Sequence, residues 1–136
     1  VSNLDFFPTL MDFAKLDIPS ETVLRGQSVI KALRDESVVV STDYFAAYST
    51  LHQSITGMRM YSDGQYKLVR DFKNKGRDEF YYLDGDPLET DNLLETELTD
   101  AEKKTLIRLD DTLKKKMFEL EDPLSVSFTP VHLKGR

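Results

Sequence analysis

The stretch ITGMRMYSDGQYKLVRDF, residues 55–72, has the pattern of two strands joined by a tight turn. Both halves carry β-branched and aromatic residues, which are typical of strands. Asp63-Gly64 at the centre is a residue pair favoured in two-residue type I′ hairpin turns. The resulting predicted cross-strand pairs are Tyr61 with Tyr66, Arg59 with Leu68, and Met58 with Val69.

Two further strands are predicted on either side of this hairpin. Residues 38–45 are β-branched and aromatic, as in a buried strand, whereas residues 46–54 show no clear period. Residues 79–83, EFYYL, form another short strand after the KNKGRD turn. Four short strands in succession with tight turns favour an antiparallel sheet.

A long amphipathic helix follows the strands. Thr99 and Glu102 form a capping box, in which each side chain accepts a backbone N–H of the first turn. Apolar residues then recur at spacings of three and four, and most lysines lie on the outer side. The stripe comprises Leu106, Leu109, Leu113, Met117 and Leu120. Asp122-Pro123 ends the helix, which we expect to cover one face of the sheet, so the fold class is α+β.

The chain also begins with a helix. Asp5 is a plausible N-cap, Pro8 is acceptable in the first turn, and Ile18-Pro19 ends the helix near Asp17. Residues 4–16 are apolar around nearly the whole circumference, so they require burial on two sides. Little sequence precedes them to provide it, and we therefore expect the chain to be part of a longer one.

Composition restricts the function classes. The chain has 136 residues, 40% of them hydrophobic and 31% charged, which describes a globular domain with a real core. A net charge of −6 disfavours a nucleic-acid binder, and no apolar run approaches membrane-spanning length. The absence of cysteine excludes disulfides and thiol catalysis within this segment.

No complete catalytic or metal motif is present. In FYYLDGDPLETDNLLE, residues 80–95, acids stand at positions 1, 3 and 12 of an EF-hand-like count, but Leu88 and Glu89 occupy the positions that require an oxygen ligand and a glycine. A structural turn is therefore favoured there, with Asn92-Leu93-Leu94 folding back onto the body. His52 with a nearby serine and an acid could be drawn as a triad, but the many serines and acids make that weak.

Five stretches, in chain order, resemble segments of the sulfatase family. They are VSNLDFFPTLMDFAKLDIP, LRGQSVIKAL, GMRMYSDGQYKLV, EFYYLDGDPLETDNLLE and MFELEDP. The first resembles v-s-x-x-D-l-x-P-T-l-l-d-l-a-g-l-x-x-P, and the fourth resembles E-L-Y-D-L-x-x-D-P-x-E-x-x-N-L-a. Together they cover residues 1 to about 123, and their order makes the resemblance specific.

The resemblance implies the C-terminal portion of an arylsulfatase-like or N-sulfoglucosamine sulfohydrolase-like enzyme of the alkaline-phosphatase superfamily. Such enzymes hydrolyse sulfate esters or sulfamates of carbohydrates with a formylglycine, made in a C/S-x-P-x-R motif, and a divalent cation, usually calcium. This chain has neither cysteine nor S-x-P-x-R, so the resemblance places the nucleophile and the metal ligands upstream of Val1. We expect the chain alone to be inactive.

The resemblance also implies a domain organisation and a setting. Residues 1–34 correspond to the end of the large α/β domain and a connector, 35–123 to the C-terminal subdomain, and 124–136 to a tail. The first helix then belongs to the larger domain, and the upstream catalytic domain is the expected partner. A periplasmic, extracellular or lysosomal location is implied.

His52, Arg59 and Tyr48 are the candidate sugar contacts, because their stretch precedes or enters the hairpin that approaches the substrate cleft in the family. The alternative is that Arg59 pairs with an acid on the sheet and His52 is an ordinary loop residue. Two alternatives for the whole chain stay open: a non-catalytic interaction module, and a phosphodiesterase or phosphatase of the same superfamily.

Overall fold

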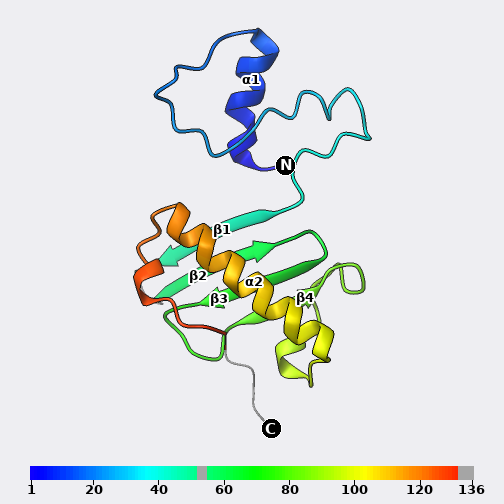
Figure 1. Ribbon diagram of the computed structural model, residues 1–136, viewed down its shortest axis with the longest axis vertical. Helices are drawn as coiled ribbons and strands as arrows, with labels where there is room; N and C mark the ends of the chain where they lie inside the picture. Colours follow the sequence, from blue (N-terminus) through cyan, green and yellow to red (C-terminus); the bar gives the residue numbers. More distant parts are fainter. Residues whose placement is uncertain (52–54, 132–136) are drawn as a thin grey trace. The chain divides into compact units, whose positions relative to one another are not determined.

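The computed structural model describes residues 1–51 and 55–131. The chain divides into two compact units, Val1–Thr42 and Asp43–Arg136, and the order of the elements within each is shown in Figure 1. Each unit is described separately below.

The second unit is a four-stranded antiparallel sheet covered on one face by a helix (Figure 1). Its strands lie in the order β1-β2-β3-β4, each beside its neighbour in sequence. The elements are β1 (Tyr44–Thr50), β2 (Thr56–Ser62), β3 (Tyr66–Asp71), β4 (Glu79–Tyr82) and α2 (Asp100–Glu119). The predicted α+β fold, with about four strands and a C-terminal helix, is confirmed.

The predicted register of the central hairpin is wrong. Tyr61 pairs with Leu68, and Gly64-Gln65, not Asp63-Gly64, forms the turn, with Gly64 at φ 90°. Asp63 instead extends the ladder, and its carboxylate accepts the N–H groups of Gln65 and Tyr66 at 3.0 and 2.7 Å. Moving the turn by one residue shifts the strand pairing by two positions. The buried face of each strand is therefore unchanged.

The first strand also differs from its prediction. β1 spans Tyr44–Thr50, so it begins near the end of the predicted strand and includes residues that show no period. The reason is its position at the sheet edge, where it pairs only with β2 and most of its side chains are exposed. A strand without a buried face has no need of alternating apolar residues.

The core lies between α2 and the sheet. Four residues of the predicted helical stripe are completely buried and pack with Tyr61, Leu68 and Phe80. They are Leu106, Leu109, Leu113 and Met117. Leu120 follows the end of the helix and is only half-buried. The predicted capping box is present, with Thr99 N–H donating to the Glu102 carboxylate at 2.7 Å.

The first unit contains a short 3-10 helix, Asn3–Asp5, and α1 (Phe6–Ala14). Asp5 stands at the N-cap position of α1, but its carboxylate accepts the N–H groups of Gln27 and Ser2 at 2.9 and 2.7 Å. α1 ends before the predicted Asp17, because Lys15 adopts the left-handed conformation at φ 55°. Gly26 packs so closely that a Cβ would lie 2.0 Å from the Leu4 carbonyl oxygen.

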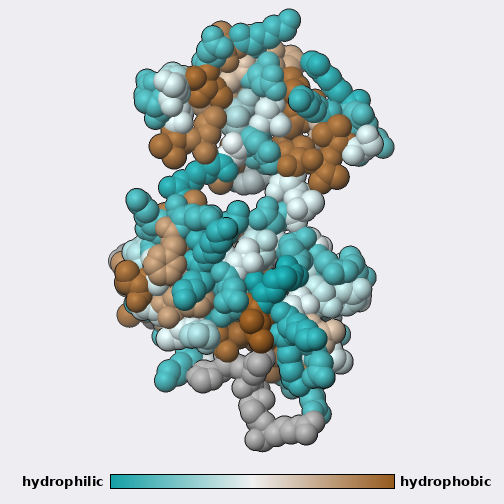
Figure 2. Space-filling model, viewed as in Figure 1, coloured by the Kyte–Doolittle hydropathy of each residue, from teal (hydrophilic) through white to brown (hydrophobic). Residues whose placement is uncertain are grey.

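Little of this first unit is buried. Asp5, Pro8 and Val29 are its buried residues. Six leucine and phenylalanine side chains of the helical segment are at least 48% exposed, whereas Met11 is half-buried, and Figure 2 shows apolar side chains gathered on the surface of the unit. The six exposed residues are Leu4, Phe6, Phe7, Leu10, Phe13 and Leu16. The expected burial of this helix on two sides stays a prediction.

Candidate functional site

Arg59 holds β2 to the end of α2 from inside the second unit. Its Nε and Nη2 donate to the two carboxylate oxygens of Asp122 at 2.5 and 3.0 Å, and the arginine is only 4% exposed. Nη1 donates to the Ser49 hydroxyl at 3.1 Å and to the Met58 carbonyl at 2.8 Å. Arg59 therefore pairs with an acid on the sheet face that α2 covers.

The Asp122 carboxylate is held in its ionised form. Burial alone would raise its pKa, but the hydrogen bonds from Arg59 and the Leu124 N–H, with the charge of the guanidinium, keep the pKa below its ordinary value. A bidentate, charge-assisted ion pair of this kind fixes the relative orientation of the two side chains as well as the distance between them. It therefore fixes the chain just after α2 against β1 and β2.

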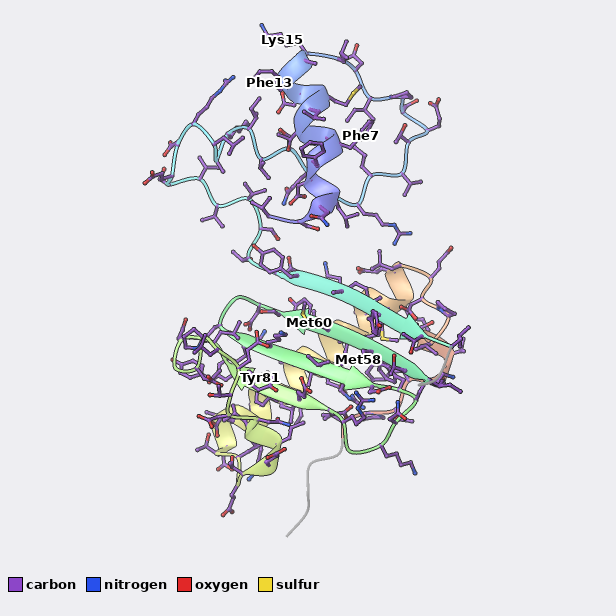
Figure 3. All side chains as sticks on the ribbon, turned by 180° about the vertical axis from the view of Figure 1, so that it is seen from behind. Phe7, Phe13, Lys15, Met58, Met60 and Tyr81 are labelled. Carbon is purple, nitrogen blue, oxygen red and sulfur yellow. The ribbon has the colours of Figure 1, made fainter. Side chains whose placement is uncertain are left out.

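Tyr48 lies on the other face of the sheet. It pairs with Met58 across β1 and β2 and is 61% exposed. Because side chains alternate along a strand, Met58 points away from the side chain of its neighbour Arg59. Figure 3 shows Met58, Met60 and Tyr81 on the face that α2 leaves open. The structure thus places Tyr48 and Arg59 on opposite faces.

His52, the third predicted contact, lies outside the described residues. A sugar-binding role for any of the three stays a prediction. The side chains of Tyr48 and Arg59 lie on opposite faces of the sheet, and the contact between the two residues is a hydrogen bond from Arg59 Nη1 to the backbone carbonyl of Tyr48 at 3.4 Å.

The open face of the sheet forms a shallow depression of about 370 Å³. Its lining is mostly apolar, with one cation and one acid at the side nearer β4. The lining residues are Ala46, Ala47, Tyr48, Met58, Met60, Lys67, Val69 and Glu79. Lys67 also donates to Glu89 at 2.5 Å, so its charge is balanced by the corner that follows β4.

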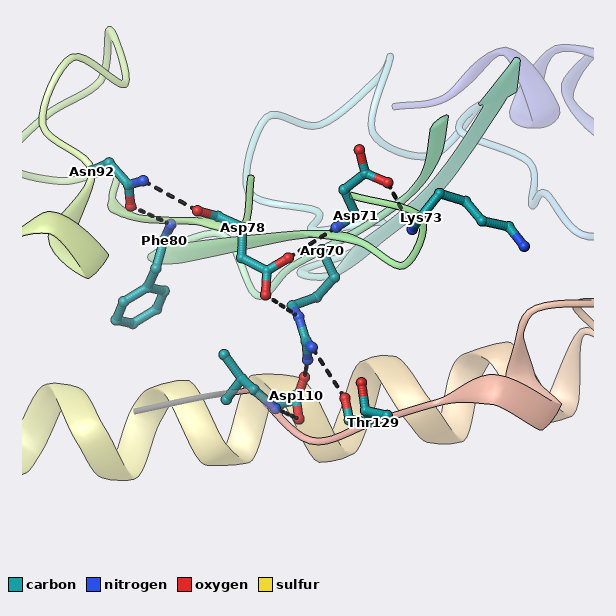
Figure 4. Close-up of polar contacts among 9 residues, drawn as sticks. Arg70, Asp71, Lys73, Asp78, Phe80, Asn92, Asp110 and Thr129 are labelled. Atoms are coloured by element: carbon teal, nitrogen blue, oxygen red, sulfur yellow. Dashed lines mark hydrogen bonds and ion pairs between the residues drawn. The ribbon is translucent and has the colours of Figure 1, made fainter. Parts of the chain in front are cut away.

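A second buried arginine, Arg70, was not among the residues predicted from the sequence. It donates to Asp78 at 2.8 Å, to Asp110 of α2, and to the Thr129 carbonyl at 3.0 Å (Figure 4). Asp110 also accepts the Val131 N–H at 2.9 Å, and burial raises the pKa of this carboxyl. The sequence contains one indication of this contact, because the acid Asp110 lies on the apolar stripe of α2, four residues after Leu106.

The corner at residues 80–95 is structural, as predicted. The Asn92 side chain accepts the Phe80 N–H at 3.0 Å and donates to the Asp78 carbonyl at 3.2 Å, so it occupies the outer edge of β4. Leu93 and Leu94 pack against the core. Within residues 1–51 and 55–131, no group of three or more His, Asp or Glu side chains could hold a metal ion.

The fold is shared with solved sulfatase structures. BT1596, described as a 2-O GAG sulfatase, aligns with a TM-score of 0.72 and 24% identity over 92% of this chain and 26% of its own. BT4656, solved with D-glucosamine-2-N,6-O-disulfate, aligns at 0.68 and 23% identity over 88% of this chain and 24% of its own. A putative sulfatase from Bacteroides thetaiotaomicron VPI-5482 aligns at 0.70 and 23% identity over 92% and 26%.

Sequence comparison identifies the family. Residues 1–122 match the model of the family described as N-sulphoglucosamine sulphohydrolase, C-terminal, and the chain belongs to this family. A protein named Sulfatase from Formosa agariphila is 33% identical over 104 residues, which is 69% of this chain and 19% of that relative. The chain thus spans about a fifth of the length of this relative. Among the described residues, no helix is long and apolar enough to cross a bilayer.

Proposed function

We propose that this chain is the C-terminal portion of a sulfatase that hydrolyses sulfate esters or sulfamates of carbohydrates. The observation that carries the proposal is the family match over residues 1–122. Two structures of the same fold support the substrate class, since one was solved with a glucosamine disulfate and the other is described as a GAG sulfatase.

The proposal assigns the chemistry to a portion upstream of Val1. The sequence has no cysteine and no S-x-P-x-R from which a formylglycine could be made. The residues that the structure describes also lack a cluster that could hold calcium, so these residues do not fit the cation, and the sequence does not fit the formylglycine. The nucleophile and the cation belong, in this proposal, to the upstream catalytic domain.

The role proposed for this chain is to support the substrate cleft from one side. Of the three predicted sugar contacts, Tyr48 and His52 keep that role in this proposal, and the exposed position of Tyr48 supports it, whereas Arg59 is only 4% exposed. Arg59 acts as a positioning residue, since its ion pair with Asp122 ties β2 to the chain after α2. It thereby fixes the strand beside Tyr48.

The coding region upstream of Val1 tests the proposal. We expect it to encode a C/S-x-P-x-R motif, and we expect the longer protein to hydrolyse an aryl sulfate or a sulfated sugar with calcium present. The purified 136-residue chain, assayed on an aryl sulfate with calcium, should give no turnover above a buffer blank. Turnover that survives repurification would contradict the assignment of the nucleophile and the cation to the upstream catalytic domain.

The same experiment separates the alternatives. An upstream sequence without the C/S-x-P-x-R motif would favour a non-catalytic interaction module. A longer protein that cleaves phosphodiesters and leaves sulfate esters intact would point to a phosphodiesterase of the same superfamily.

A further inference from the structure

The loop between β3 and β4 carries a concentration of positive charge. Residues 73–77, KNKGR, include three cations and no acid in a chain whose net charge is −6. All three cationic side chains are exposed. Within the described part of the chain, neither Lys73 nor Lys75 has an acidic partner, and Arg77 has one, Asp71, at 3.6 Å.

The loop is held in place by a buried carboxylate beneath it. The Asp71 side chain is 0% exposed and accepts hydrogen bonds from three surrounding groups. The donors are Gly57 N–H at 3.1 Å, Lys73 N–H at 3.0 Å and Asn74 Nδ2 at 2.8 Å. Burial would raise the pKa of Asp71, but these hydrogen bonds keep it below its ordinary value. These hydrogen bonds therefore hold the backbone of the loop in one position.

Two contacts bind the same loop to the beginning of β2. Asn74 Nδ2 donates to the Ile55 carbonyl at 2.8 Å, and the Phe72 N–H donates to the Gly57 carbonyl at 3.1 Å. The aliphatic stem of Lys73 packs over Gly57, where an added Cβ would lie 2.9 Å from Lys73 Cγ. The direction in which Lys73 leaves the surface is thus set by packing.

Nearby acids do not neutralise this charge. Asp78 directs its carboxylate to the buried Arg70 at 2.8 Å, which also pairs with Asp110, and among the described residues Asp78 makes no ion pair with Lys73, Lys75 or Arg77. Asp71 balances only one of the three cations, so the loop keeps a local charge of +2 from Lys73, Lys75 and Arg77 against Asp71. A positive patch on an acidic protein attracts anions locally, while the rest of the surface repels them.

We propose that residues 73–77 form a binding surface for the sulfate groups of a sulfated carbohydrate chain. This inference rests on the proposed function for its choice of anion. Each exposed contact with an ammonium or guanidinium group is weak, so the surface suits a chain with several sulfates and not a single ion. A fixed loop lowers the ordering cost of such binding.

Amide NMR titration of the 136-residue chain with a heparin hexasaccharide at low salt tests this surface. We expect the largest shifts at residues 73–77 and weaker binding as salt is added, because these charges are exposed. The Lys73→Gln/Lys75→Gln variant should bind roughly threefold to tenfold more weakly. The matched control is Lys104→Gln/Lys115→Gln, which removes the same charge from the exposed side of α2 and should bind like the parent chain.

The proposal would be overturned by shifts elsewhere than residues 73–77, by equal losses in the two double variants, or by no binding to a parent chain whose spectrum shows it folded. A fully desulfated hexasaccharide should cause no shifts. Inorganic sulfate at matched sulfate concentration should bind more weakly, and equal binding would contradict a surface for a multiply sulfated chain. An oligodeoxythymidylate of equal charge that binds as tightly would contradict the assignment to carbohydrate.

This titration does not depend on the catalytic test. If the longer protein hydrolyses sulfate esters but the loop fails to bind, the surface is wrong and the proposed function stands. If the loop binds but the upstream region lacks the nucleophile motif, the proposed function is wrong while the anion surface stands.

Discussion

The two units of this chain differ in how they cover their apolar residues. In the second, α2 places four completely buried side chains against the sheet, so its apolar residues are covered by its own elements. In the first, α1 leaves its phenylalanines 48–72% exposed, and the buried positions are Asp5, Pro8 and Val29. The apolar side chains of α1 therefore do not form a core within their own unit.

The difference teaches which part of the chain can fold by itself. Burial of each large apolar side chain contributes about 1.5–3 kcal/mol, and the second unit obtains this from its own residues. The first unit is held mainly by polar contacts such as the one from Asp5 to Gln27. We therefore expect its apolar surface to be covered in the parent protein by the upstream domain, and to self-associate in the isolated chain.

The largest effect is expected from Arg59→Ala, which leaves Asp122 buried without its partner. Breaking a buried pair in this way costs about 3–5 kcal/mol. The matched control is Arg108→Ala, whose side chain is 53% exposed and pairs with Asp63. An exposed pair is worth about 0–1 kcal/mol. Urea unfolding of both variants would show whether the Arg59 pair supports the second unit, and equal losses would contradict it.

Substitution of one leucine in each unit compares the contributions of the two units to the free energy of unfolding. Leu113→Ala should lower the free energy of unfolding by about 2–5 kcal/mol, because it opens a cavity at a completely buried site. Leu10→Ala, at a site 48% exposed, should change it by less than about 1 kcal/mol. Chemical denaturation at low protein concentration measures both. A loss at Leu10 as large as that at Leu113 would mean that the first unit has a core of its own.

Acid should weaken the second unit through Asp122 and Asp71. Both have a folded pKa below the ordinary value, so their contribution is present above the unfolded pKa of about 3.9 and is lost as the pH falls through the folded pKa. Asp110 works the other way, since its raised pKa favours the protonated form. Urea midpoints between neutral pH and pH 3 should fall, and Asp122→Asn should reduce that fall. An unchanged pH profile would contradict the role of the pair.

The smallest effect is expected from Thr99→Ala. Loss of this N-cap removes the acceptor for the Glu102 N–H, at 3.3 Å, and should cost about 1 kcal/mol. Thr112→Ala is the control within the same helix, since its hydroxyl donates to the Arg108 carbonyl and does not cap. Thermal unfolding compares the two. A cost at Thr112 equal to that at Thr99 would show that the cap is not the source.

Local patterns predicted much of the second unit. The capping box at Thr99, the stripe that contains Leu113, and the antiparallel order of the strands all follow from short-range spacing. The register of the β2–β3 hairpin does not follow from short-range spacing. The Asp63 side chain stabilises a turn at the next two residues, and a sequence pattern does not show which pair of residues forms the turn. Asp110 stood on the apolar stripe, but its partner Arg70 lies 40 residues away in the chain.

The candidate site was harder to predict for the same reason. Tyr48 of β1 pairs with Met58 of β2, and Arg59, the sequence neighbour of Met58, points its side chain to the opposite face of the sheet. This cross-strand pairing has no local signal in the sequence. The position of the KNKGR loop depends on the Asp71 carboxylate of β3, which accepts a hydrogen bond from the Gly57 N–H of β2, 14 residues away in the chain. In the first unit, the contact of Asp5 with Gln27 spans 22 residues and has no local signal.

Hydrogen exchange of the purified chain, measured over a dilution series, tests the difference between the units most directly. We expect amides of α2 around Leu109 and Leu113 to exchange slowly at every concentration, because they open only with the whole unit. Amides of α1 around Leu10 should exchange quickly in dilute solution and more slowly as association covers them, with light scattering rising in parallel. A version beginning at Ser20 should remain monomeric. Slow exchange of α1 in a dilute, monodisperse monomer would contradict the account, because the first unit would then be covered by the chain itself.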